Sequence, residues 1–118
     1  AMAAAAVVEM LDGTPEQSFH GAAMAIKNIL GLVCDPVAGL VEIPCIKRNA
    51  GGVAGALLAA DLALGGVKSR IPFDDTVEAM NRVGKQLPSS LRETAAGGLA
   101  TTKAGLEMAK AIAKDSQA

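Results

Sequence analysis

The sequence predicts an all-α fold, a bundle of about five to six alanine-rich helices with one irregular cysteine-bearing loop. About one residue in five is alanine, hydrophobic residues make up 51% of the chain, and aromatic residues only 2%. Alanine is the strongest helix former, and apolar residues recur at helical spacing in several segments, whereas none shows the sustained alternation of a strand. Because alanine buries little area, we expect a thin core that depends on a partner or on further sequence.

The first two helices are predicted over residues 1–11 and 15 to about 30. Asp12-Gly13 ends the first helix. The second begins with a strong signal, in which Thr14 is the N-cap, Pro15 occupies the first helical position, and Gln17 completes a capping box. The expected apolar face of this second helix consists of Phe19, Ala22, Ala23, Ile26, Ile29 and Leu30.

An irregular loop, CDPVAGLVEIPC, carries the only two cysteines, Cys34 and Cys45. Pro36 and Pro44 lack a backbone donor and favour extended backbone in the residues before them. A third helix is predicted from about residue 49 to 64, ending at two glycines. Its internal glycines indicate either the close approach of another backbone or a cluster, or tight helix packing; they are Gly51, Gly52 and Gly55.

The last part of the chain predicts three more helices. Asp74 or Asp75 would cap the fourth, whose stripe at Val77, Met80, Val83 and Leu87 is expected in the core. Ser90 and Glu93 form a second capping-box pattern, which predicts a short helix that ends at Gly97-Gly98. A final helix over about residues 102–113 is expected to bury Leu106, Ala109 and Ile112.

Charge and hydropathy exclude several classes of function. The net charge of −1 and the pI near 5.8 give no reason to expect a nucleic-acid partner, which usually needs a basic face. The longest apolar stretch, residues 53–66, is interrupted by Asp61 and is too short for a membrane span. The first residues lack the basic region of a signal peptide. Two cysteines without an export signal predict reduced thiols or metal ligands in the cytoplasm.

The cysteine loop and the residues after it are the best candidates for chemistry. Two thiols on an irregular loop could form a disulfide, a metal site or an iron–sulfur site, or remain buried free thiols. The fork of Arg48 suits a substrate carboxylate and Asn49 can donate to an oxyanion, although both could instead cap the third helix. His20, the only histidine, could be a base but is more simply a surface or core residue.

Two segments carry a resemblance to a known family. CDPVAGLVEIPCIKRNA and LRETAAGGLA resemble the α chain or catalytic domain of bacterial iron–sulfur L-serine dehydratases, also called L-serine ammonia-lyases. The resemblance implies that three cysteines bind a [4Fe-4S] cluster and that Cys34 and Cys45 are two of them. The third would lie upstream of residue 1. Residues 1–118 are therefore expected to be the C-terminal part of that catalytic domain, truncated at its N-terminus and unable to hold the cluster alone.

The same resemblance implies the reaction, the dehydration and deamination of L-serine to pyruvate and ammonia. One iron of the cluster would accept the substrate hydroxyl, Arg48 and Asn49 are the candidate catalytic residues, and the base is expected outside this chain. In the second segment, Gly97 and Gly98 could turn backbone amides towards a ligand or simply end a helix.

The expected partners are the missing N-terminal catalytic sequence, a β domain or subunit, and further copies of the chain. Two alternatives stay open. One is a related [4Fe-4S] cysteine desulfidase, and the other is a non-catalytic helical interaction module. The isolated chain is expected to be inactive.

Overall fold

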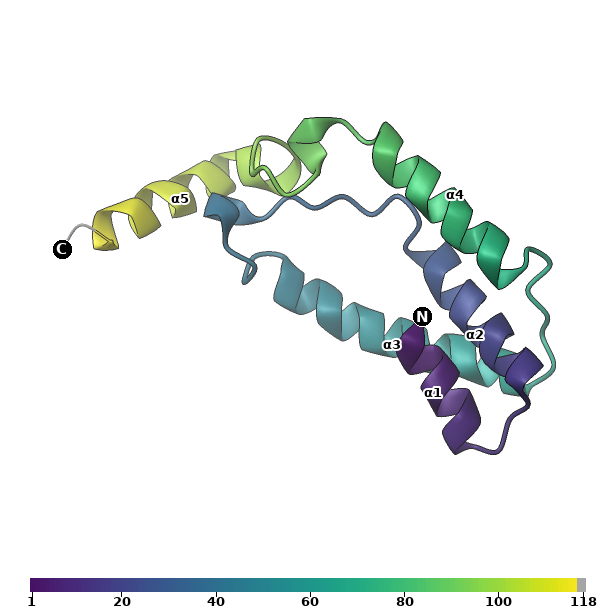
Figure 1. Ribbon diagram of the computed structural model, residues 1–118. Helices are drawn as coiled ribbons and strands as arrows, with labels where there is room; N and C mark the ends of the chain where they lie inside the picture. The colour runs from purple at the N-terminus through teal and green to yellow at the C-terminus, as the bar shows by residue number, and fades with distance from the viewer. Residues whose placement is uncertain (117–118) are drawn as a thin grey trace. The chain divides into compact units, whose positions relative to one another are not determined.

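A computed structural model describes residues 1–116 and confirms the all-α prediction (Figure 1). Residues 1–116 contain no β-strand and only one isolated β-bridge, which pairs Cys34 with Arg92. No helix in this range is both long and apolar enough to cross a membrane. The α-helices are α1 (Met2–Met10), α2 (Pro15–Asn28), α3 (Cys45–Leu64), α4 (Phe73–Gln86) and α5 (Lys103–Asp115). The 3-10 helices are η1 (Val37–Gly39), η2 (Ser89–Leu91) and η3 (Gly98–Thr101).

The chain divides into two compact units. The first unit contains Ala1–Gly31 and Ala50–Gln86, and therefore holds α1, α2, most of α3 and α4. The second unit contains Leu32–Asn49 and the described residues from Leu87 onward, and holds the first turn of α3, the 3-10 helices and α5. Both cysteines belong to the second unit, so this unit positions the candidate site.

Alanines pack the core of the first unit. The face of α3 that points inward meets α1 and α2, and Gly21 of α2 lies beside residues of both other helices. A Cβ atom at Gly21 would lie 3.4 Å from Val8 Cγ2 and 3.6 Å from the Ala59 carbonyl oxygen. Small residues therefore let these helices approach closely, as the composition predicts. The core cluster consists of Ala4, Val8, Met24, Ala25, Ala56, Ala59, Ala60 and Ala63.

The predicted start of α2 is confirmed. The Thr14 hydroxyl accepts a hydrogen bond from the Gln17 amide at 3.2 Å, and the Gln17 side-chain oxygen accepts one from the Thr14 amide at 2.9 Å. These bonds satisfy two amides that a helix start leaves without partners. The Gln17 side-chain amide also donates to the Ala63 carbonyl at 3.1 Å, which ties α2 to the end of α3.

The predicted apolar faces are only partly buried. In α2, Ala22, Ala23 and Ile26 are buried as expected, but Phe19 is exposed, and so are Ile29 and Leu30, which follow the end of the helix at Asn28. The α4 stripe was predicted to be core, and this is wrong, because Met80 is 41% exposed and its neighbours in the stripe are half-buried. Helix α4 lies beside α2 (Figure 1), and only Thr76 on it is buried. It begins at Phe73, so Asp74 and Asp75 lie in its first turn instead of capping it.

Helix α5 buries less than predicted. Leu106 is 49% exposed, and Ala109 and Ile112 are only half-buried. The one buried residue of α5 is Gly105, which lies against η3, where a Cβ atom would come within 2.9 Å of the Ala100 carbonyl oxygen. Helix α5 packs against η1 and η3, but its only fully buried residue lies in the first turn.

One helix boundary and one short helix differ from the prediction. Helix α3 begins at Cys45, not near Asn49, because the Pro44 carbonyl already accepts hydrogen bonds from the amides of Lys47 and Arg48. The prediction of a helix after Ser90 is wrong. Only η2 forms there, without a side-chain cap, and Glu93 takes a left-handed φ of 64° that ends the helical geometry.

The α3 glycines do not mark a close approach among the described residues. A Cβ atom added at Gly51, Gly52 or Gly55 would meet nothing within 4 Å. This surface of α3 is therefore open in residues 1–116, and neither the close approach of another backbone nor tight helix packing is found at these glycines.

Candidate functional site

The cysteine loop pairs directly with the last residue of η2 and the residues that follow it. The Cys34 amide donates to the Leu91 carbonyl at 2.9 Å, and the Glu93 amide donates to the Cys34 carbonyl at 2.8 Å. These two bonds form the parallel bridge between Cys34 and Arg92. The two segments that the sequence analysis singled out are thus neighbours in the second unit, and both backbone polar groups of Cys34 are fixed.

Asp35, immediately after Cys34, is the most buried charged residue of the site. Only 1% of its surface is exposed. Its Oδ1 accepts a hydrogen bond from Arg48 Nη1 at 2.6 Å, and its Oδ2 accepts one from the Leu99 amide at 2.6 Å. Arg48 Nη1 also donates to the Val33 carbonyl at 3.0 Å. A buried carboxylate thus has a cation on one oxygen and a backbone donor on the other, which offsets its loss of hydration.

Gly98 makes room for this carboxylate. It has a left-handed φ of 60°, and a Cβ atom there would lie 2.7 Å from the Asp35 Cβ and also overlap the carboxylate. Gly97 is equally confined, since a Cβ atom would lie 2.8 Å from the Ser90 carbonyl oxygen. The paired glycines therefore let the backbone come close enough for the Leu99 amide to reach Asp35.

Burial and charge set the ionisation of the two acidic groups. Burial alone would raise the pKa of Asp35, but hydrogen bonds from the Leu99 amide and Arg48, together with the Arg48 charge, outweigh it and hold that pKa below its usual value. Burial raises the pKa of the Cys34 thiol, and the nearby acidic groups of Glu93, Cys45 and Asp35 add to this effect, which Arg48 opposes.

Both cysteines are half-buried free thiols. Cys34 lies just before η1, and Cys45 is the first residue of α3. Thiolates are soft ligands suited to iron–sulfur clusters, so the donor type fits such a group. In residues 1–116, however, no three side chains of His, Cys, Asp or Glu are arranged to hold a metal ion. The described residues therefore offer two thiols of a suitable donor type and no complete set of metal ligands.

The other predicted site residues differ in their surroundings. Arg48 lies with the cysteines, but its Nη1 is engaged by Asp35 and Val33. Asn49 is exposed on α3, one turn beyond Cys45 and on the same face. His20 belongs to the first unit, where Glu16 Oε1 lies 3.4 Å from its Nε2. Of the predicted residues, the structure therefore groups Cys34, Cys45, Arg48 and Asn49 in one unit.

Sequence reasoning missed Asp35. Its partners lie 13 and 64 residues away along the chain, and no local pattern connects them. One signal was available. Asp35 lies on a loop, and the helix that follows this loop carries Arg48, so the two residues are candidates for an ion pair. That signal names a possible partner but not the burial, which depends on Gly98 and Leu99.

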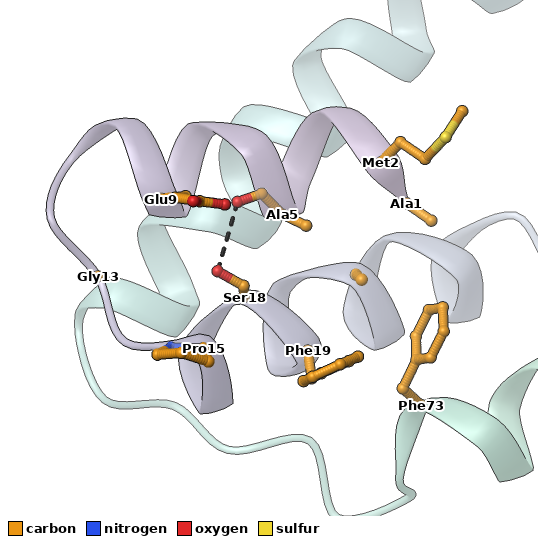
Figure 2. A pocket seen from close by; sticks show the side chains of 10 residues that line it. Ala1, Met2, Ala5, Glu9, Gly13, Pro15, Ser18, Phe19 and Phe73 are labelled. Atoms are coloured by element: carbon orange, nitrogen blue, oxygen red, sulfur yellow. Dashed lines mark hydrogen bonds between the residues drawn. The ribbon is translucent and has the colours of Figure 1, made fainter.

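A separate groove of about 540 Å³ lies in the first unit (Figure 2). Its polar side chains are Glu9 and Ser18, and the Ser18 hydroxyl donates to the Ala5 carbonyl at 3.5 Å. Phe19 and Phe73 form part of its apolar wall, with ring centroids 5.7 Å apart. The groove has neither thiols nor a cation to hold a carboxylate, so it is not the candidate for chemistry. Its remaining lining residues are Ala1, Met2, Gly13, Pro15 and Ala22.

Comparison with known proteins gives concordant matches. The family model described as serine dehydratase alpha chain matches residues 1–100. The chain is 60% identical over 111 residues to a probable L-serine dehydratase alpha chain of Bacillus subtilis, which covers 94% of this chain and 37% of that protein. It is 56% identical over 115 residues to the L-serine dehydratase alpha chain of Peptoniphilus asaccharolyticus, with 98% of this chain and 39% of that protein covered.

More distant relatives share the same region. L-serine dehydratase 1 of Escherichia coli is 45% identical over 100 residues, which are 84% of this chain and 22% of that protein. The chain thus spans well under half the length of these relatives. The family model covers most of the chain and includes both cysteines and the paired segment around Arg92. The chain belongs to the serine dehydratase alpha chain family.

Proposed function

We propose that this chain is the cysteine-bearing part of an iron–sulfur L-serine dehydratase, a lyase that converts L-serine to pyruvate and ammonia. Relatives that match nearly the whole chain are named L-serine dehydratase alpha chains, which supports the substrate and the reaction. The observation that carries the proposal is the pairing of Cys34 with Leu91 and Glu93, which joins the two family-like segments around a free thiol.

Cys34 and Cys45 are proposed to hold a [4Fe-4S] cluster together with a third thiolate from sequence outside this chain. When bound, such a cluster supplies a Lewis acid for the hydroxyl leaving group. Both cysteines are free and lie in the same unit, which supports their binding one group. This chain contributes the fixed backbone around Cys34 and the first turn of α3 that carries Cys45.

Arg48 and Asn49 are proposed to act on the substrate. The Arg48 guanidinium uses Nη1 for Asp35 and Val33, and its side chain is 27% exposed, so the opposite edge of its fork can meet a carboxylate. Asn49 presents its amide at the surface one turn after Cys45. The base that removes the Cα proton is proposed to lie outside this chain.

The active enzyme is proposed to be a cytoplasmic assembly. The relatives' names specify an alpha chain, which supports a β domain or subunit as partner. Exposed apolar side chains on α3, such as Val53 and Leu58, support further association with other subunits or copies.

The decisive experiment is anaerobic purification of the intact enzyme that contains this chain, followed by iron and acid-labile sulfide analysis and by product assays. We expect about four irons per active site and pyruvate release from L-serine. Sulfide release from L-cysteine without pyruvate from serine would favour a desulfidase. A protein with no iron and neither activity would favour a helical interaction module and contradict the proposal.

Serine substitutions of the cysteines test the ligand assignment. Cys34→Ser or Cys45→Ser is expected to lose the cluster and nearly all activity, because a hydroxyl is a poor replacement for thiolate on iron. Glu42→Gln is the matched control, since Glu42 is an exposed residue of the same loop. Visible absorbance and initial rates on the same preparations measure both effects. Full iron content in both cysteine variants would show that the ligands lie elsewhere.

A further inference from the structure

We propose that Asp35 is a positioning residue that holds Cys34 and Cys45 in a fixed relation through its ion pair with Arg48. The inference rests on the proposed function in one respect, namely that the two thiols are ligands of one metal group. Its structural content, the coupling of the two cysteine backbones, stands on contacts among the described residues alone.

Three segments of the second unit meet at the Asp35 carboxylate. Asp35 is bonded directly to Cys34, whose amide and carbonyl are paired with the last residue of η2 and the residues that follow it. Its Oδ1 holds Arg48, which lies one turn after Cys45 on α3. Its Oδ2 holds the amide of Leu99 in η3. One side chain thus connects the backbone beside the first thiol to the helical turn that begins with the second.

Asp35 is unsuited to act on substrate itself. Its surface is almost completely buried, and each carboxylate oxygen already accepts a hydrogen bond from a fixed donor. A general base needs access to the proton that it removes. Asp35 must therefore act through the residues that it holds, as partners of metal ligands commonly do.

The chemistry of the site requires a carboxylate. Both groups that face Asp35, the Arg48 guanidinium and the Leu99 amide, can only donate. A carboxylate offers an acceptor to each. In Asp35→Asn the side-chain amide offers one acceptor oxygen and one donor NH2 group. That NH2 group would face either the Arg48 guanidinium or the Leu99 amide, which are also donors. This variant therefore keeps the size of the side chain while it breaks one of the two connections.

The first test measures how fast iron leaves the intact, iron-loaded enzyme in the presence of a chelator, below the temperature at which the protein unfolds. Partners of metal ligands typically change metal affinity by 10–100-fold, so Asp35→Asn is expected to release iron roughly tenfold faster or more. Arg48→Lys keeps the charge but loses the planar fork and should show a smaller increase. Glu42→Gln, an exposed acid on the same loop, should match the wild type.

A second measurement uses the metal-free protein, so that it does not depend on the proposed cluster. A bifunctional maleimide can join Cys34 to Cys45 only while the two sulfur atoms lie at a distance that its span matches. The rate of cross-linking therefore reports how often the two thiols are held at that distance. For a cross-linker whose span suits the wild type, Asp35→Asn is expected to lower the yield of the internal cross-link severalfold, relative to single labelling. Arg48→Lys should again lie between Asp35→Asn and the Glu42→Gln control.

These outcomes separate the possible failures. If the wild-type enzyme holds no iron, the proposed function fails, and the cross-linking result alone decides the role of Asp35. A residue that only stabilises the fold would lower the unfolding temperature but leave both rates at the control value, and that result would overturn the proposal. If Asp35→Asn does not fold, Arg48→Lys still decides, because rates equal to those of Glu42→Gln would contradict the proposed coupling.

Discussion

The two units of the chain are stabilised internally by different kinds of contact. In the first unit, α1, α2 and α3 bury a continuous set of small apolar side chains around Val8, and its ion pairs, such as Lys68–Glu16, lie at the surface. In the second unit few apolar side chains are buried, chiefly Val37 and Ala100. Backbone pairing at Cys34 and the buried Asp35 carboxylate take their place there.

This difference indicates that the second unit has less stabilising apolar burial and instead contains contacts that fix the positions of particular residues. A buried ion pair is weak support for a fold, because desolvation cancels much of its attraction, but it fixes its members in one arrangement. Left-handed backbone at Ala38, Glu93 and Ala95 adds to this pattern in the second unit, whereas in the first unit Asp12 is the one non-glycine residue with a positive φ among those described. Strained backbone of this kind tends to gather where function requires a set geometry. The unit that carries both cysteines is thus the one built from polar contacts and strained turns.

The largest expected effect comes from removing the cation of the buried pair. Arg48→Ala leaves the Asp35 carboxylate buried with no cation, which typically costs about 3–5 kcal/mol. Hydrogen exchange of the Cys34 and Glu93 amides measures the effect, because both amides belong to the pairing beside Asp35. Their opening free energy should fall by about that amount, up to the limit of the unit's own stability.

Arg82→Ala is the matched control for this prediction. Arg82 donates to Glu78 at 2.7 Å, but both side chains of this pair are 63% exposed on α4. Exposed pairs one helical turn apart contribute only about 0.3–0.5 kcal/mol. If both arginine variants change hydrogen exchange equally, the second unit does not depend on its buried pair and the comparison between the units fails.

An intermediate effect is expected from enlarging the alanine core. Ala59 is fully buried on α3, so Ala59→Val should force neighbours apart and destabilise the first unit by about 1–3 kcal/mol. Ala54→Val carries the same change in helix propensity at an exposed position of the same helix. Urea unfolding followed by helical circular dichroism compares them. Equal losses would mean that propensity, and not tight packing, controls this helix.

Local signals predicted the helices, and tertiary contacts decided the rest. The capping box at Thr14 and the glycine pair after Leu64 depend on neighbouring residues, and both gave correct boundaries. The stripe on α4 has the right period and α4 packs beside α2, yet Met80 stays exposed. Periodicity shows which face is apolar and does not show how much of that face a neighbour covers.

The candidate site shows the same division. The cysteine loop was recognisable from its residues, but its construction was not, because Asp35 depends on Leu99, 64 residues away. Ser90 and Glu93 matched a helix start, yet pairing of the Glu93 amide with Cys34 accompanies a left-handed turn that excludes the helix. A long-range backbone bond overrode a local propensity at the place where the two segments meet.

A smaller effect is expected at the start of α2. Thr14→Ala removes the acceptor for the Gln17 amide and should cost about 1 kcal/mol in the first unit. Thr14→Ser keeps the hydroxyl and is the control. A decrease in the midpoint of urea unfolding for Thr14→Ala alone would confirm that the cap matters beside the alanine core. No difference between the two variants would show that water or the neighbouring chain replaces the cap.

The smallest expected effect concerns the surface charges of the first unit. The Lys68 ammonium, 3.2 Å from Glu16 Oε1, is the main cause that lowers the pKa of Glu16, and His20 contributes less. A carboxyl whose pKa is lowered on folding stabilises the fold above its ordinary pKa and loses that contribution as the pH falls through the folded value. Lys68→Met should therefore raise the pKa of Glu16 towards its ordinary value, and His20→Ala should raise it less. Carbon NMR of the Glu16 carboxyl between pH 2 and 7 measures both pKa shifts, and 1 M salt should reduce them because exposed charges are screened.

A larger pKa shift for His20→Ala than for Lys68→Met would reverse the assigned order of causes. A pKa shift that salt leaves unchanged would mean that this pair is shielded from solvent like Asp35.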